Sequence, residues 1–192
     1  MSESHEHEQS GEWPRLGPRI WVASLSDYNA GRLHGEWVDA AVEESELRES
    51  VRRILASSPE QGAEEWGIFD YDNFGAYKVG EYEDLATVAG IARGIEERGF
   101  AFATWAVVSD THIDDLSIEF EDAFLGHFDS KELFVDSVLE DFDVEATLER
   151  ELPSWLQPHV RIDRDGIASD MQISGELILE DAPEGGIYVF RR

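Results

Sequence analysis

The chain has 192 residues, of which 43 are Asp or Glu and 15 are Lys or Arg, so its formal charge at pH 7 is −28. A surface this acidic excludes direct binding to DNA or RNA, because a nucleic-acid interface places basic side chains opposite the phosphates. The absence of cysteine excludes disulfides and thiolate chemistry. Hydrophobic residues make up 42% of the chain and aromatic residues 11%, so a packed core can form and disorder of the whole chain is excluded.

The first residues of the chain are polar and acidic. Residues 1–18 combine Ser, Glu and His with two prolines, and we expect them to form a disordered tail. Residues 1–9 lack the apolar stretch of a signal peptide, and no run in the chain approaches the roughly 18 apolar residues of a membrane span. We therefore expect a cytoplasmic protein that does not bind membranes.

The first third of the chain has the pattern of a small β-β-α-β unit. Runs rich in β-branched and aromatic residues alternate with turn-forming residues, and one segment has apolar residues at helical spacing before the stop signal Ser57-Ser58-Pro59. The pattern predicts strands at 19–25, 35–39 and 66–71, a turn at 26–34, and a helix with the apolar residues Leu47, Val51, Ile54 and Leu55.

The pattern in the remainder of the chain predicts helices followed by short strands. A helix is predicted over 84–98, with Leu85, Val88, Ala92 and Ile95 on one stripe and Gly99 at its end. Residues 100–118 are predicted to form short helices, whereas the phenylalanines of 119–128 fit either period. Three short strands are predicted near 159–163, 175–180 and 186–191. The fold class is therefore α+β, built of small units. Repulsion between the many negative charges favours an elongated arrangement of these units.

Negative charge is densest over residues 111–152, which hold 14 acidic side chains against Lys131 and Arg150. Within this segment, 129–143 has the pattern of an amphipathic helix that Asp129 can cap. Five carboxylates fall within an arc of about 80° and span about 21 Å, while apolar side chains occupy the opposite side. These carboxylates belong to Asp129, Glu132, Asp136, Glu140 and Asp143, and the apolar side comprises Phe134, Val135, Val138, Leu139 and Phe142.

The spacing of this row is close to that of nucleic-acid phosphates, since one DNA strand has a phosphate about every 3.4 Å along the axis. A charged helix face is, however, more often ordinary solvated surface. An acidic surface with only two lysines, Lys78 and Lys131, is also typical of proteins adapted to high salt. The pattern alone leaves these alternatives open.

Several segments of the sequence resemble one known family. The segment from Pro18 to Ala40, PRIWVASLSDYNAGRLHGEWVDA, closely resembles the opening of the ArdA antirestriction family, as does AEEWGIFDYDNF at 63–74. Phe69 stands where that family usually has His. Weaker similarities continue through FEDAFLGHFDS at 120–130, LPSWL at 152–156 and DRDGIASD at 163–170, so the resemblance covers residues 18–192 in order.

The resemblance implies a non-enzymatic DNA mimic that occupies the DNA-binding groove of Type I restriction–modification enzymes. Members of the family are elongated, consist of three small domains, and dimerise through the C-terminal one. By this resemblance the domains are 19–79, 80–118 and 119–192, and 119–128 is extended. The predicted partner is the methyltransferase core of such an enzyme, together with a second copy of the chain. The predicted acidic surface comprises Asp114, Asp115, Glu119, Glu121, Asp122, Asp129, Glu132, Asp136, Glu140 and Asp143.

Competing functions have weaker support. The alternative from a different class is an acidic interaction module that binds another basic DNA-binding protein. Residues 70–81 place acids and Gly75 at some positions of a calcium loop, but Phe74 stands at a ligand position. His5 and His7 could hold a metal weakly, and Asp110 with His112 lacks a nucleophile motif. We therefore expect no metal, cofactor or catalytic residue.

Overall fold

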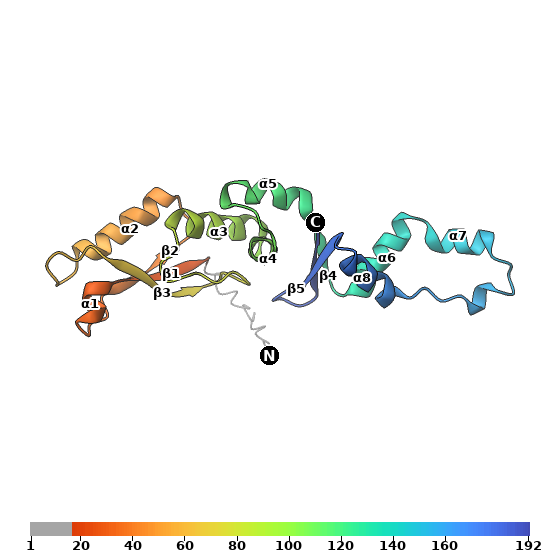
Figure 1. Cartoon of the computed structure of the whole chain (residues 1–192), viewed down its shortest axis with the longest axis horizontal. Coiled ribbons are helices and arrows are strands. Elements are labelled where there is room, and N and C mark those ends of the chain that lie inside the picture. Colours follow the sequence, from red (N-terminus) through yellow and green to blue (C-terminus); the bar gives the residue numbers. More distant parts are fainter. Residues whose placement is uncertain (1–16) are drawn as a thin grey trace, which may run out of the picture.

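The computed structural model describes residues 17–192 of the chain, so most of the predicted tail, residues 1–16, lies outside the described residues. Figure 1 shows an elongated molecule, in which a sheet and helices at one end are followed along the long axis by a second sheet and further helices. Helices and small antiparallel sheets are both present, which confirms the α+β class. Gly17 and Pro18 are held to the first sheet, because the Pro18 carbonyl accepts a hydrogen bond of 2.9 Å from the Ala40 N–H.

The first sheet has the strand order β2-β1-β3 and is antiparallel. Its strands are β1 (Arg19–Ser24), β2 (Gly35–Asp39) and β3 (Trp66–Asp72). Helix α2 (Glu44–Ala56) buries Leu47, Val51 and Ile54, whose helical spacing places them on one side facing the sheet. The predicted turn contains a short helix, α1 (Leu25–Asn29), which begins where the Ser24 hydroxyl accepts the Asp27 N–H.

Three helices form the middle of the molecule, where the sequence predicted a helix over 84–98 and short helices over 100–118, and the third of them continues to Ala123. They are α3 (Leu85–Arg98), α4 (Phe100–Val108) and α5 (Ile113–Ala123). Asp84 caps α3, and Gly99, with φ of 73°, allows the chain to leave α3 and enter α4 without a break. Gly94 is needed for packing, because a Cβ at this position would lie 2.0 Å from the Phe102 ring.

The second sheet has the strand order β4-β6-β5, also antiparallel. Its strands are β4 (Phe124–Phe128), β5 (Leu177–Asp181) and β6 (Ile187–Arg191). The connection between β4 and β5 contains the helices α6 (Lys131–Asp141), α7 (Val144–Glu151) and α8 (Arg164–Ile173), and the short 3₁₀ helix η1 (Gln157–His159). None of the residues of α7 is buried, so this helix projects along the far end of the molecule (Figure 1).

Two local expectations for this region were wrong. Residues 119–128 are neither one strand nor one helix, since α5 continues to Ala123 and β4 begins at Phe124. Residues 159–163 form no strand, and the sequence analysis did not identify α8. The Asp163 carboxylate accepts the Gly166 N–H at 2.9 Å and starts α8, so a glycine that disfavours helix in isolation is accommodated in its first turn.

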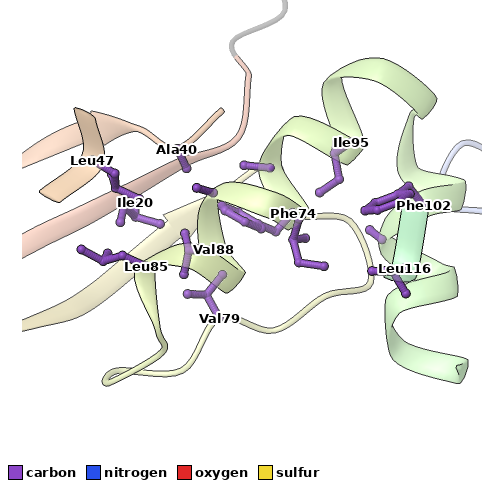
Figure 2. Packing of buried hydrophobic residues seen from close by; sticks show 14 of the residues in the cluster. Ile20, Ala40, Leu47, Phe74, Val79, Leu85, Val88, Ile95, Phe102 and Leu116 are labelled. Atoms are coloured by element: carbon purple, nitrogen blue, oxygen red, sulfur yellow. The ribbon is translucent and has the colours of Figure 1, made fainter. Parts of the chain in front are cut away.

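One large hydrophobic core runs through the first sheet and the three middle helices. Figure 2 shows Phe74 between Ile20, Leu47 and Leu85 on one side and Ile95, Phe102 and Leu116 on the other. This core contains residues from both sides of position 79, where the resemblance places a domain boundary. The division into three domains stays a prediction.

Strand β6 joins this core to a second, smaller one. Tyr188 and Phe190 are buried in the first core, where Phe190 lies 5.3 Å from Trp105 between ring centroids. Ile187 and Val189, on the opposite face of the same strand, are buried in the second core with Phe134, Val135 and Leu139 of α6. Because side chains alternate between the faces of a strand, one five-residue segment connects the two halves.

We predict that removing a side chain from either face of β6 destabilises both halves together. Phe190→Ala and Ile187→Ala should each lower the free energy of unfolding by about 2–5 kcal/mol, as for other large-to-small changes in a core. Urea unfolding gives the stability, and amide hydrogen exchange reports α3 and α6 separately. Ile173→Ala is the control, because Ile173 is 84% exposed and its loss should cost less than about 0.5 kcal/mol. Phe190→Ala with unchanged exchange in α6 would contradict the prediction.

Candidate functional site

The structure places the predicted acidic residues on consecutive elements from α5 to the start of α7. Five lie on α5, namely Asp114, Asp115, Glu119, Glu121 and Asp122. Three lie on α6, Glu132, Asp136 and Glu140, with Asp129 just before that helix and Asp143 just after it. All are exposed apart from Asp136, which is half-buried. Figure 1 shows that α5, α6 and α7 follow one another along the long axis.

Few of these carboxylates are neutralised by a basic side chain. Glu121 accepts a hydrogen bond of 2.7 Å from Arg98, and Asp136 pairs with Arg164 of α8. Asp114 lies 3.3 Å from the His112 ring. Among residues 17–192, no Arg or Lys forms an ion pair with the other seven, which are Asp115, Glu119, Asp122, Asp129, Glu132, Glu140 and Asp143.

Most arginines form ion pairs with carboxylates outside the predicted acidic surface. Seven arginines that form ion pairs lie between positions 19 and 98, and most of their carboxylate partners lie in the same part of the chain. These arginines are Arg19, Arg32, Arg48, Arg52, Arg53, Arg93 and Arg98. Only Arg150 and Arg164 form such pairs between positions 111 and 192 of the described chain. Uncompensated negative charge therefore gathers over α5, α6 and the turn before α7.

The predicted helix face differs in detail from the observed one. Helix α6 is capped by Ser130, whose hydroxyl accepts the Leu133 N–H at 3.3 Å, and not by Asp129. The helix ends at Asp141, and Asp143 has a left-handed backbone with φ of 50°. One helix face therefore holds only Glu132, Asp136 and Glu140, at intervals of four residues. Phe142, predicted to be buried, is 75% exposed because it follows the end of the helix.

Close carboxylates affect one another at the start of α6. The Ser130 hydroxyl lowers the pKa of Glu132, and the neighbouring Glu132 carboxylate raises the pKa of Asp165 at the start of α8. Sequence reasoning missed Asp165, since no pattern indicates that the first turns of α6 and α8 meet. Acidic groups from two distant segments thus share one stretch of surface.

A cleft of about 550 Å³ lies where α6 meets α7 and α8. Besides Asp136, Glu140 and Asp143 it is lined by Glu145 and Glu149 of α7, which the sequence analysis left out of the acidic surface. The sequence could have indicated them, because residues four apart in a helical segment lie on the same face. Arg164 enters the same cleft, and its Nη2 lies 3.5 Å from the Glu145 carboxylate. The cleft is thus acidic with one arginine, which joins α8 to both other helices.

Other candidate chemistry finds little geometric support. Residues 17–192 contain no group of three or more His, Asp or Glu side chains arranged to hold a metal ion. In the segment resembling a calcium loop, Phe74 is buried in the core and Asp72 pairs with Arg19 at 3.0 Å. Asp110 and His112 lie in the connection before α5. The histidines His5 and His7 lie outside the described residues.

None of the helices between residues 17 and 192 combines the length and the apolarity needed to cross a bilayer.

One carboxylate is part of the fold instead of the surface. The Asp27 side chain is fully buried, accepts a hydrogen bond from the Ser58 hydroxyl and lies 3.2 Å from Arg32 Nε. The bond from Ser58 is the main reason that the pKa of Asp27 lies below its ordinary value, and Ser24 and Arg32 act in the same direction. Asp27 therefore holds α1 to the residues that follow α2.

The comparison with protein families supplies an independent observation. A family model described as "Antirestriction protein (ArdA)" matches residues 20–182 of the chain. No curated protein matches it. The family match includes the first sheet from Ile20 on, the strands β4 and β5 of the second sheet, and every carboxylate of the predicted acidic surface, and it ends before β6.

The buried Asp27 gives a prediction for pH. Because its pKa is lowered in the folded state, its contribution to stability is present above the ordinary pKa of 3.8 and is lost as the pH falls below that value. Asp27→Asn should therefore be less stable than the native chain at pH 7, and this difference should shrink between pH 4 and pH 3. Urea unfolding across this range measures it, with the exposed Glu46→Gln as the control. A stability difference that does not vary with pH would show that the charge of Asp27 is unimportant.

Proposed function

The chain belongs to the ArdA antirestriction family, and we propose that it inhibits restriction by imitating DNA. In this proposal its acidic surface occupies the basic DNA-binding groove of the methyltransferase core of Type I restriction–modification enzymes. The inhibitor makes and breaks no covalent bond, acts in the cytoplasm and works as a homodimer. It thereby blocks DNA binding by competition.

The observation that carries this proposal is the concentration of uncompensated carboxylates over α5, α6 and the turn before α7. A basic protein groove binds DNA tightly in part because the counterions around the phosphates are released on binding. A surface of unpaired carboxylates also holds counterions, which the same groove can release. Carboxylates already paired with arginine offer much less, because their charge is neutralised within the chain. The seven unpaired acidic side chains from Asp115 to Asp143 are therefore the principal contacts in this proposal.

The spacing of charge on α6 supports a collective contribution. Glu132, Asp136 and Glu140 follow one another at about 6 Å, four residues of helix rise, whereas one DNA strand has a phosphate about every 3.4 Å. One helix face thus has just over half as many carboxylates per unit length as a strand has phosphates, and one of these carboxylates, that of Asp136, is neutralised by Arg164. Acids beside it, such as Asp129 and Asp143, and those of α5 and α7 raise the density toward that of DNA.

An inhibitor that imitates the phosphates of DNA should act independently of base sequence. Phosphate contacts position a protein on DNA but convey no base sequence, so an inhibitor that imitates phosphates should act on enzymes with different recognition sequences. A folded scaffold also avoids ordering its charges at the moment of binding. The connection of both halves through β6 supports such a scaffold.

Dimerisation remains part of the proposal. It comes from the family resemblance, and exposed apolar side chains between 119 and 192 support it, since exposed apolar groups often mark protein interfaces. The most exposed of these side chains belong to Leu133, Phe142, Trp155 and Ile173. The domain limits 19–79, 80–118 and 119–192 likewise remain proposals.

The decisive experiment is displacement of a labelled oligonucleotide from a purified Type I methyltransferase core. We predict that the native chain displaces it and that neutralising five unpaired acids weakens displacement at least about fivefold at low salt, since each exposed charge contact is worth about 0.2–1 kcal/mol. The variant combines Asp115→Asn, Glu119→Gln, Asp122→Asn, Glu132→Gln and Glu140→Gln. A single change such as Glu140→Gln should have an effect below about fivefold.

A matched control removes the same charge from other exposed and unpaired positions. It combines Glu46→Gln, Glu64→Gln, Glu96→Gln, Asp170→Asn and Glu176→Gln. Equal weakening in both five-site variants would mean that net charge, and not its position, causes inhibition. A native chain that displaces DNA from unrelated basic proteins but not from the Type I core would favour a general acidic interaction module.

A further inference from the structure

The outer face of the first sheet holds a group of aromatic and charged side chains that the acidic surface does not include. Helices α2 and α3 cover the other face of this sheet, and Figure 1 shows no helix of residues 17–192 lying across the outer face beyond α1 at its end. Residues paired directly across antiparallel strands point to the same side. The register therefore places two rows on this face, one with Arg19, Asp39 and Asp72 and the next with Trp21, Trp37 and Asp70.

The two indole rings contact each other and remain accessible. Trp21 and Trp37 lie 5.9 Å apart between ring centroids, with their planes at 70°, an edge-to-face arrangement. Trp37 is 39% exposed and Trp21 is partly exposed. Two contacting tryptophans on an open sheet face leave part of their apolar surface in water, and contiguous exposed apolar surface often marks an interaction site.

An arginine of the chain already shows which chemistry this face accepts. The guanidinium carbon of Arg19 lies 4.6 Å from the centroid of the Trp37 ring. Its Nε and Nη2 donate hydrogen bonds of 3.3 and 3.0 Å to the Asp72 carboxylate. Arg19 is thus held by an aromatic ring and a carboxylate at once, a combination that suits a planar guanidinium better than an ammonium group.

The neighbouring row repeats this combination without an arginine from the described chain. Trp21 and Asp70 are direct partners in the register, as Arg19 and Asp72 are. No Arg or Lys between positions 17 and 192 forms an ion pair with Asp70 or Asp39. Of the three carboxylates on this face, only Asp72 is neutralised. The face therefore has net negative charge and an indole beside a carboxylate that no basic side chain of the described residues neutralises. The Asp70 Oδ1 accepts the Tyr71 N–H at 2.8 Å, so its Oδ2 is the oxygen left for a guanidinium.

We propose that this outer face is a docking surface for arginine side chains of a basic partner protein, with Trp21 and Asp70 receiving a guanidinium. The inference rests on the proposed function, because the partner in question is the basic DNA-binding groove of the restriction enzyme. It adds a contact that DNA itself does not make. Phosphates attract Lys and Arg through charge, whereas Trp21 with Asp70 favours arginine through ring stacking and a paired hydrogen bond.

The test compares two basic peptides of equal charge. Fluorescein-labelled nona-arginine and nona-lysine are titrated with the native chain in 150 mM NaCl, and anisotropy gives the affinities. We expect tighter binding of nona-arginine, and we expect Trp21→Leu and Asp70→Asn each to weaken it about two- to fivefold while nona-lysine changes less. Asp70→Asn keeps the size of a surface side chain, so it tests the site even if Trp21→Leu fails to fold.

Matched controls place the same changes at other exposed positions. Tyr82→Leu removes an aromatic ring that is 70% exposed outside this face, and Glu46→Gln removes one unpaired charge from α2. Both should leave the arginine preference intact. Equal binding of the two peptides by the native chain, or equal weakening by the control and test variants, would overturn the inference.

The displacement assay separates this inference from the proposed function. A native chain that displaces oligonucleotide from the Type I core while Trp21→Leu and Asp70→Asn do so equally well would leave the function standing and exclude the docking surface. A native chain that prefers nona-arginine through Trp21 and Asp70 but displaces no oligonucleotide would exclude the function, while the arginine-binding face would stand.

Discussion

The packing of β6 between two hydrophobic cores is the constraint on which the rest of the structure depends. A chain with a formal charge of −28 repels itself, and repulsion alone would separate its two halves. Tyr188 and Phe190 on one face and Ile187 and Val189 on the other oppose that separation, because burying each large apolar side chain contributes about 1.5–3 kcal/mol. The strand also fixes orientation, since both cores must fit the same short backbone segment. An elongated acidic protein can thus keep its charges at set positions.

The distribution of arginine explains why the charge is uneven along the molecule. Arginines between positions 19 and 98 pair mainly with carboxylates in that same part of the chain, whereas beyond position 110 only Arg150 and Arg164 form ion pairs. Arg164 lies between Asp136 of α6 and Glu145 of α7 and forms an ion pair with each, which reduces the repulsion between these two carboxylates. The remaining acids of α5 and α6 face water. Apolar packing beneath them, and not ion pairing, keeps them in place.

The sequence predicted local elements well where the apolar pattern extended over several turns or along a strand. Helices α2 and α3 and the strands of the first sheet are confirmed, because the apolar residues of the helices recur at helical spacing and the strands are rich in β-branched and aromatic residues. It failed where a boundary depends on one side chain, as at Ser130, which caps α6 in place of Asp129. The extended run at 159–163 found no partner strand, and α8 depends on the Asp163 cap. Long-range contacts such as Arg164 with Asp136 left no local signal. Residues of the acidic surface were identified by composition and resemblance, whereas their pairing required the fold.

Two kinds of recognition can therefore coexist on this scaffold. Charge over α5 and α6 acts at a distance and is screened by salt, since the Debye length is about 8 Å at physiological ionic strength. Contacts such as that between Arg19 and Trp37 act only at short range and lose less in salt, because ring and guanidinium exclude water between them. An inhibitor with charge alone would bind any basic groove and would lose affinity steeply with salt. In the proposed arrangement, a stacked aromatic face at the other end of the molecule restricts binding to partners that present arginine at the matching distance, so specificity arises from the separation between the two surfaces.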